Sequence, residues 1–271
     1  MIRSFDELEQ QVRKPPRKRL VLAMAEEAHA LKAVVEAFSK GIVEPVLVGH
    51  EGAIGELAAR EGLDISSFRI LHTEGERECA ARAVALVRTG EAEILMKGKV
   101  PTAVIMAFVL DNENGLKGAG LLSHLTLIEF RPYPKLLFMS DPGLNIAPDL
   151  AAKAAILENA VRAAHKLGIE RPRAAVIAAV EKVNPGSMPA TVDAAALSKM
   201  AERGQIPDCI VDGPLALDSA LSRESCEVKG ITSEVGGDAD ILLMPDIEAA
   251  NVFYKTLAFF TDARMAATVA S

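Results

Sequence analysis

Short apolar runs alternate with longer amphipathic stretches along most of the chain. Residues 19–25, RLVLAMA, predict a strand, and residues 26–41 predict a helix with Gly41 as its C′ residue. Further strands are expected at 44–49, 68–73, 93–98, 173–180, 209–213 and 239–246. Further helices are expected at 51–62, 75–90, 150–168, 189–204 and 248–263. Apolar strands separated by helices indicate parallel pairing and an α/β fold.

The pattern changes after residue 115. Residues 120–130 and 135–141 are two strand-like runs joined only by RPYP. Such a short connection cannot hold a crossover helix, so we expect these two strands to be antiparallel. The change places a domain boundary near 134–147. We therefore predict one α/β domain over 1–140 and a second over 141–271.

Composition and net charge argue against some classes of binding partner. The chain has 271 residues, 4% aromatic residues and a net charge of −7. Scarce aromatic residues and an acidic balance argue against binding to nucleic acid or to an anionic membrane. An anion would have to be bound by locally concentrated positive charge.

Targeting and metal signals are weak. The polar N-terminus, MIRSFDELEQQ, predicts no signal peptide, and the apolar runs are too short to cross a bilayer. Cys79, Cys209 and Cys226 lie far apart, as expected for free thiols in a reducing compartment. We find no metal-ligand spacing and expect a cytoplasmic protein without a bound metal.

Polar residues collect where the predicted strands end, and ligands of open α/β sheets bind at the carboxyl ends of strands. Lys97, Gly98 and Lys99 follow one strand and precede a helix that begins near Thr102. Free N–H groups and the helix dipole favour an anion at such a turn. The alternative is a pair of solvated loop lysines.

Several long segments, taken together, are distinctive. They read MKGKVPT, SDPGLNIAPD, AAVEKVNPGSMPATVDAAALSKM, CIVDGPLALDSALS and ADILLMPDIEAANVFYKTL. In this order they resemble the phosphate acetyl/butyryltransferase family, and EKVNPGSMPAT and DGPLALD are more similar to the butyryltransferase branch. The resemblance covers about residues 15–263.

The resemblance implies a two-domain, three-layer fold of the isocitrate/isopropylmalate dehydrogenase type, with mostly parallel sheets and an active-site cleft between the domains. It implies transfer of a short acyl group, butyryl or acetyl, between coenzyme A and inorganic phosphate, which yields acyl phosphate. Coenzyme A would be a substrate, with no tightly bound cofactor. Family members are usually homodimers or larger homo-oligomers. The acyl chain length and the oligomer size stay open.

The chemistry suggests roles for the residues at the strand ends. A carboxylate acting as general base can deprotonate the thiol of coenzyme A, and hydroxyl or amide donors can stabilise an oxyanion. The predicted catalytic residues are Asp141, Asp212 and Ser123. The predicted substrate-binding residues are Lys97, Gly98, Lys99, Thr102, His124, Asn145, Lys182, Asn184, Asp246, Asn251 and Lys255. The alternative for Asp212, Asp246 and Asn251 is helix capping. Because Ser123 and His124 are neighbours in a strand, at most one of them is expected to face the ligand.

One departure from the family pattern affects the expected activity. Family members continue past the last helix into a further strand and a loop with a Ser–Arg pair, whereas this chain ends in FFTDARMAATVAS. We therefore expect the usual C-terminal strand of the first domain to be absent. The chain would be a shortened enzyme or a non-catalytic homologue that binds acyl-CoA or acyl phosphate. A dehydrogenase of the same fold class is a third hypothesis, without a convincing set of metal ligands.

Overall fold

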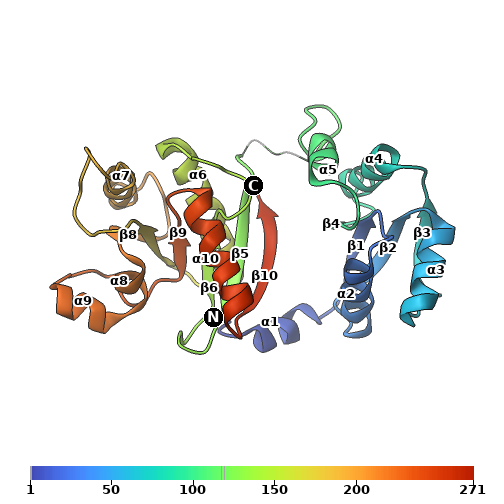
Figure 1. Cartoon of the computed structure of the whole chain (residues 1–271), viewed down its shortest axis with the longest axis horizontal. Coiled ribbons are helices and arrows are strands. Elements are labelled where there is room, and N and C mark those ends of the chain that lie inside the picture. The colour runs from blue at the N-terminus through green and yellow to red at the C-terminus, as the bar shows by residue number, and fades with distance from the viewer. Residues whose placement is uncertain (1, 117, 119) are drawn as a thin grey trace. The chain divides into compact units, whose positions relative to one another are not determined.

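The computed structural model describes residues 2–116, 118 and 120–271, which form two compact units. The larger unit combines Met1–Leu8 with Ala119–Ser271, and the smaller unit is Glu9–Gly118. In Figure 1 the smaller unit runs from blue to green, and the larger one runs from green to red apart from its blue N-terminal residues 2–8.

The smaller unit is a parallel four-stranded sheet with helices on both faces. Its strands pair in the order β3-β2-β1-β4. Their bounds are β1 Lys18–Ala23, β2 Val43–Gly49, β3 Arg69–His72 and β4 Ile94–Lys97. The helices are α1 Phe5–Val12, which begins in the larger unit, α2 Ala28–Ser39, α3 Glu51–Glu61, α4 Glu76–Arg88 and α5 Thr102–Val109.

Alternation along β1 produces the two cores of this unit. Leu20 and Leu22 pack with residues of α2 and α3, whereas Val21 and Ala23 pack with residues of α4 and α5. Because successive strand side chains point to opposite faces, one apolar strand supports two helix layers. Gly41 has a φ of 77° just past α2, which confirms its predicted C′ position.

The larger unit contains a mixed six-stranded sheet with the order β10-β5-β6-β9-β7-β8. Its strands are β5 Ser123–Glu129, β6 Leu137–Ser140, β7 Arg173–Ile177, β8 Ile210–Leu215, β9 Ile241–Leu243 and β10 Arg264–Ala270. The four strands β6, β9, β7 and β8 are parallel, and β5 is antiparallel to both of its neighbours. The antiparallel pairing of β5 with β6 confirms the prediction from the short RPYP connection.

Helices cover both faces of this sheet as well. They are α6 Leu150–Lys166, α7 Ala190–Glu202, α8 Leu217–Leu221, α9 Arg223–Lys229 and α10 Ile247–Phe260. One core brings α6 and α7 against β5, β6, β7 and β9, and the other brings α8 and α10 against the opposite face. Leu157, Val161 and Ala164, spaced by four and three residues along α6, are buried and form the core-facing side of this helix.

Two expectations differ from this architecture. The strand expected to be absent after the last helix is present: β10 pairs with β5 along its whole length, from Arg264 opposite Glu129 to Ala270 opposite Ser123. The expected division at residue 140 falls at the end of β6, inside the larger sheet. Pairing of β5 with β6 and of β6 with β9 holds residues on both sides of that position in one unit.

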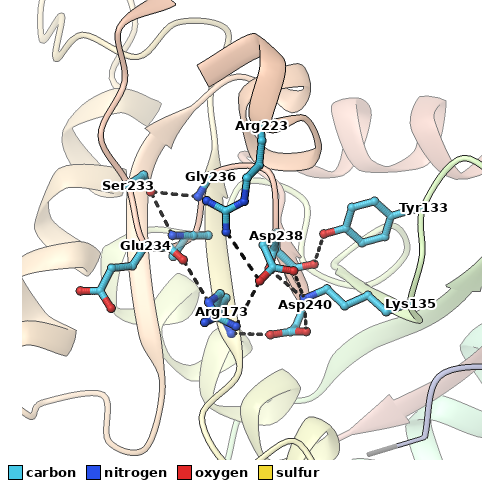
Figure 2. A network of polar contacts seen from close by, with 11 residues as sticks. Tyr133, Lys135, Arg173, Arg223, Ser233, Glu234, Gly236, Asp238 and Asp240 are labelled. Carbon is cyan, nitrogen blue, oxygen red and sulfur yellow. Dashed lines mark hydrogen bonds and ion pairs between the residues drawn. The ribbon is translucent and has the colours of Figure 1, made fainter. Parts of the chain in front are cut away.

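Ionic contacts join the amino ends of β6, β7 and β9 (Figure 2). Buried Asp240 accepts hydrogen bonds from Lys135 Nζ at 2.6 Å and from the Arg173 backbone N–H at 2.8 Å. Asp238 lies 2.8 Å from Lys135 Nζ and 3.2 Å from an Arg173 guanidinium nitrogen. The Tyr133 hydroxyl donates to the Ala239 carbonyl at 2.5 Å, and burial raises the pKa of this hydroxyl far above its usual range. These contacts pair the buried charge of Asp240 and connect the amino ends of the three strands.

Among the described residues, no helix has the length and apolar character that a membrane span requires.

Candidate functional site

Asp141 organises the loop that follows β6. Its Oδ1 accepts from the backbone N–H groups of Gly143 and Leu144, both at 2.8 Å. Its Oδ2 accepts from the His124 N–H at 3.0 Å, the Asn145 N–H at 3.3 Å and Asn145 Nδ2 at 2.6 Å. Five donors occupy the acceptor positions of a carboxylate that is only 4% exposed. These contacts favour a positioning role for Asp141 over the predicted role of general base.

His124 lies beside this loop. It is the second residue of β5, so the antiparallel direction of β5 places it at the carboxyl end of β6. Its imidazole packs edge-on to the Tyr254 ring, with the ring centroids 6.4 Å apart. Burial lowers the pKa of the His124 imidazole below its usual value, although the Asp141 carboxylate opposes this shift.

The start of α10 completes the same edge. The Asn251 side chain donates to the Pro142 carbonyl at 3.0 Å, which connects α10 to the loop after β6. Asp246 caps α10 by accepting from the Ala249 N–H at 2.9 Å, as the capping alternative anticipated. Lys255 is exposed further along α10. The structure therefore gathers His124, Asp141, Asn145 and Asn251 into one connected cluster.

Ser123 is separated from this cluster. Its side chain is fully buried and accepts a hydrogen bond from Asn159 Nδ2 at 2.8 Å. The same Nδ2 also donates to the Ala270 carbonyl at 3.2 Å, so the contact ties β10 to α6. The catalytic role predicted for Ser123 has no support in these surroundings. Alternation along β5 explains the outcome: Ser123 faces the core, whereas His124 is only half-buried.

The remaining predicted residues of the larger unit follow β7 and β8. Asp212 is half-buried in β8, and its Oδ1 accepts from the N–H of Gly213 at 2.8 Å. Lys182 and Asn184 are exposed in the loop between β7 and α7, where Asn184 accepts from the Ser187 N–H. Within the described part of the chain, these three residues share no hydrogen bond or ion pair with the His124 cluster.

In the smaller unit, the turn after β4 differs from the predicted anion loop. Lys97 Nζ donates to the carbonyls of Gly98 and Val100, both at 3.1 Å, so its ammonium is engaged with its own turn. Gly98 is buried, and a Cβ there would lie 2.4 Å from the Met24 carbonyl oxygen. Close strand packing therefore requires this glycine. Lys99 and Thr102 are exposed at the start of α5, which has no side-chain cap.

A group of side chains that sequence spacing did not reveal lies at the same edge. His50, His72 and Glu74 bring one potential metal-ligand atom each within 4.8 Å of one another. However, Nδ1 of His50 accepts from the Ala53 N–H and Nδ1 of His72 accepts from the Glu51 N–H, both at 3.2 Å. The neutral rings therefore hold their protons on Nε2, and this tautomer caps α3 instead of presenting Nε2 lone pairs to a metal.

Two further features were not predicted from the sequence, namely a role for Tyr254 and the partners of Glu181. Tyr254 was hidden in an apolar helix, although its spacing of three residues from Asn251 places both on one helix face. Glu181, just after β7, accepts from Lys229 Nζ at 2.8 Å and from the Ser219 hydroxyl at 2.7 Å. The Lys229 hydrogen bond lowers the pKa of the Glu181 carboxyl. Because Lys229 is 48 residues away, no local pattern indicates this contact.

Known proteins are similar to this chain in sequence and in fold. The family model described as phosphate acetyl/butaryl transferase matches residues 4–83 and 76–267. A phosphate butyryltransferase of Clostridium acetobutylicum is 45% identical over 264 residues, which are 97% of this chain and 87% of that protein. A phosphate acetyltransferase of Thermotoga maritima is 42% identical over 93% of this chain and 85% of its own length.

A solved structure agrees with these sequence relatives. The branched-chain phosphotransacylase from Enterococcus faecalis V583 superposes with a TM-score of 0.81 at 31% identity, covering 93% of this chain and 88% of that one. The predicted α/β fold class is therefore confirmed. The chain belongs to the phosphate acetyl/butyryl transferase family.

Proposed function

We propose that this chain catalyses reversible transfer of a short-chain acyl group between coenzyme A and inorganic phosphate. The observation that carries the proposal is the 45% identity to a phosphate butyryltransferase across 97% of the chain. In the phosphorolysis direction, a phosphate oxygen attacks the thioester carbonyl carbon. The carbon–sulfur bond then breaks, and coenzyme A leaves as the thiolate.

The cluster at the carboxyl edge of the larger sheet supports acyl transfer. His124 and Asn251 offer donors near a loop that Asp141 fixes through five hydrogen bonds. Donors held in place before the reaction stabilise a developing oxyanion without reorganising at the moment of reaction. The exposed ammonium groups of Lys182 and Lys99 are suited to the anionic substrates.

The direct test is thiol release from butyryl-CoA, measured with a thiol-reactive dye in the presence and absence of phosphate. We expect release only with phosphate, and release that is absent or independent of phosphate would refute the proposal. Coenzyme A binding without turnover, measured by calorimetry, would identify a non-catalytic homologue instead. Parallel assays with acetyl-CoA and a branched acyl-CoA would establish which acyl group the protein prefers.

Substitution of single lysines tests substrate binding. We expect Lys99→Ala and Lys182→Ala to raise the KM for phosphate or coenzyme A by about 10- to 100-fold, since a charge-assisted hydrogen bond contributes about 1.5–3 kcal/mol. Lys199→Ala is the matched control, because Lys199 is an exposed lysine paired with Glu202 on α7. Unchanged KM values for both substrates would indicate that Lys99 and Lys182 are solvated loop residues without a role in substrate binding.

We also propose a cytoplasmic homodimer or larger homo-oligomer with no tightly bound cofactor. Three free, buried cysteines support a reducing compartment. Light scattering coupled to size-exclusion chromatography tests the oligomeric state, and a monomer at assay concentration would contradict it.

A further inference from the structure

The His124 backbone is fixed on both sides. Its N–H donates to Asp141 Oδ2 at 3.0 Å, and its carbonyl accepts from the Ser140 hydroxyl at 2.9 Å. The ring packs against Tyr254 and lies close to Gly143, where a Cβ added to the glycine would lie 3.5 Å from two ring carbons. The imidazole is therefore held in one place at the carboxyl edge before any ligand arrives.

The two ring nitrogens have different surroundings. Nδ1 is buried and has no hydrogen-bond partner among the described residues. Nε2 also has no hydrogen-bond partner among the described residues. Because it is not one of the atoms that are both buried and unpaired, it is accessible to solvent. The ring thus presents one nitrogen outward and buries the other without a partner among the described residues.

This difference determines the tautomer. A buried N–H without an acceptor costs about 1–3 kcal/mol, whereas an N–H on Nε2 can reach water or substrate. Unsatisfied buried donors are also rarer in proteins than unsatisfied acceptors. Burial favours the neutral ring, because it lowers the pKa of the imidazole. A neutral His124 therefore carries its proton on the outward nitrogen.

We propose that His124 is an uncharged hydrogen-bond donor, through Nε2–H, to the acyl carbonyl oxygen as that oxygen becomes the oxyanion of the tetrahedral intermediate. This inference rests on the proposed acyl transfer. When phosphate attacks the carbonyl carbon, the π electron pair moves onto oxygen, and Nε2–H donates to this oxygen without transferring its proton. When the carbon–sulfur bond breaks, the pair returns to form the carbonyl, and the sulfur leaves with its bonding electrons.

The same geometry argues against a general-base role for His124. A base would need a free lone pair on the outward Nε2, which would leave the proton on Nδ1, buried without an acceptor among the described residues. Neutral imidazoles can serve as electrophilic donors in enzymes when their surroundings keep them uncharged. The donor role therefore matches the arrangement better than proton transfer does.

Three variants distinguish the roles. The amide nitrogen of His124→Gln reaches about the position of Nε2, that of His124→Asn reaches about the position of Nδ1, and His124→Ala has neither. We expect kcat for phosphate-dependent thiol release to fall about 10²–10³-fold in His124→Asn and His124→Ala, the cost of one oxyanion donor. His124→Gln should recover at least tenfold of this loss and keep the wild-type pH profile of kcat. His165→Gln, whose Nε2 contacts the Asp208 carbonyl in the same unit, is the control and should retain wild-type kcat.

The outcomes separate this inference from the proposed function. A wild-type protein without phosphate-dependent release would refute both. An active wild type with kcat within about twofold in His124→Asn and His124→Ala would overturn only the His124 role. Equal losses in His124→Gln and His124→Asn, with the acid limb of the pH profile removed, would indicate a base and overturn the donor role. A rise in the KM for phosphate alone would indicate a phosphate contact and overturn it as well.

A measurement on the unmodified protein keeps the inference testable if variants misfold. Nitrogen-15 chemical shifts of the His124 ring distinguish the protonated nitrogen from the unprotonated one. We expect the proton on Nε2 at pH 7.5, and a proton on Nδ1 would overturn the inference.

Discussion

The ion pair between Lys135 and Asp240 offers a sharp test of how the larger unit is stabilised. The side chain of Asp240 is 1% exposed and that of Lys135 is 12% exposed, with 2.6 Å between Nζ and Oδ1. Lys135→Met keeps most of the side-chain volume and removes the charge. Among the described residues, Asp240 would then keep only the Arg173 N–H, at 2.8 Å, as a close donor.

The magnitude follows from leaving a buried carboxylate without its cation. Removing one partner of a buried pair costs about 3–5 kcal/mol. Partial exposure of Lys135 and the remaining N–H donor reduce the penalty, so we expect a loss of about 3 kcal/mol in the free energy of unfolding. Urea denaturation followed by circular dichroism should show a midpoint lower by about 1 M.

A second substitution tests the cause. When Asp240→Asn is combined with Lys135→Met, neither member of this pair carries a charge, and the introduced amide oxygen can still accept from the Arg173 N–H. This double variant should therefore be more stable than Lys135→Met alone. Lys199→Met removes one member of an exposed pair and should leave the midpoint unchanged. A loss below about 1 kcal/mol in Lys135→Met, or no recovery in the double variant, would refute the assignment of a buried-charge penalty.

Three further predictions concern other parts of the molecule. Gly98→Ala places a Cβ 2.4 Å from a backbone carbonyl oxygen and should destabilise the smaller unit by about 1–3 kcal/mol. Gly55→Ala on α3 places a Cβ with nothing within 4 Å and should stabilise this unit by about 0.5–1 kcal/mol. Thermal denaturation tests both variants, and equal effects would contradict the packing argument. The folded protein holds the pKa of His124 below its ordinary 6.5, so on acidification the unfolded chain binds a proton at this imidazole first. The free energy of unfolding should therefore fall as pH drops below 6.5. In urea titrations at several pH values, His124→Gln should show a weaker dependence of stability on pH. The hydrogen bond from Lys229 is the main cause that holds the pKa of Glu181 below its ordinary 4.5. The contribution of Glu181 to stability is therefore present above pH 4.5 and is lost as pH falls through the lowered pKa. In urea titrations, Lys229→Met should lose less stability than wild type on acidification below pH 4.5, and parallel curves of stability against pH would contradict this.

Local patterns predicted most of the fold because each element carries its own signal. The apolar run of β1, the face of α6 and the short connection between β5 and β6 are all visible within a few residues. The strand β10 is different: RMAATVA contains mostly small residues, and the pairing of its backbone with β5, more than 130 residues earlier, holds it in the sheet.

The site was predictable as a location and less so as chemistry. Carboxyl ends of parallel strands meet at one edge, so the sequence could place Asp141, Asn145 and Asn251 together. It could not show that five N–H groups converge on Asp141, since the His124 donor comes from another strand. Nor could it show which of Ser123 and His124 faces the core, because that depends on the register of β5 against its neighbours.

Chain order has a consequence for synthesis. Residues 2–8 belong with the larger unit, yet the whole smaller unit is inserted before the rest of it begins. The Ile2 N–H finds its acceptor at the Leu167 carbonyl, and the Phe5 N–H at the Glu129 carboxylate. A chain emerging from the ribosome would complete the smaller unit first, since domains generally fold as units from the N-terminus. Residues 2–8 would stay without their hydrogen-bond acceptors until more than 120 further residues, up to Glu129 and beyond, had been synthesised.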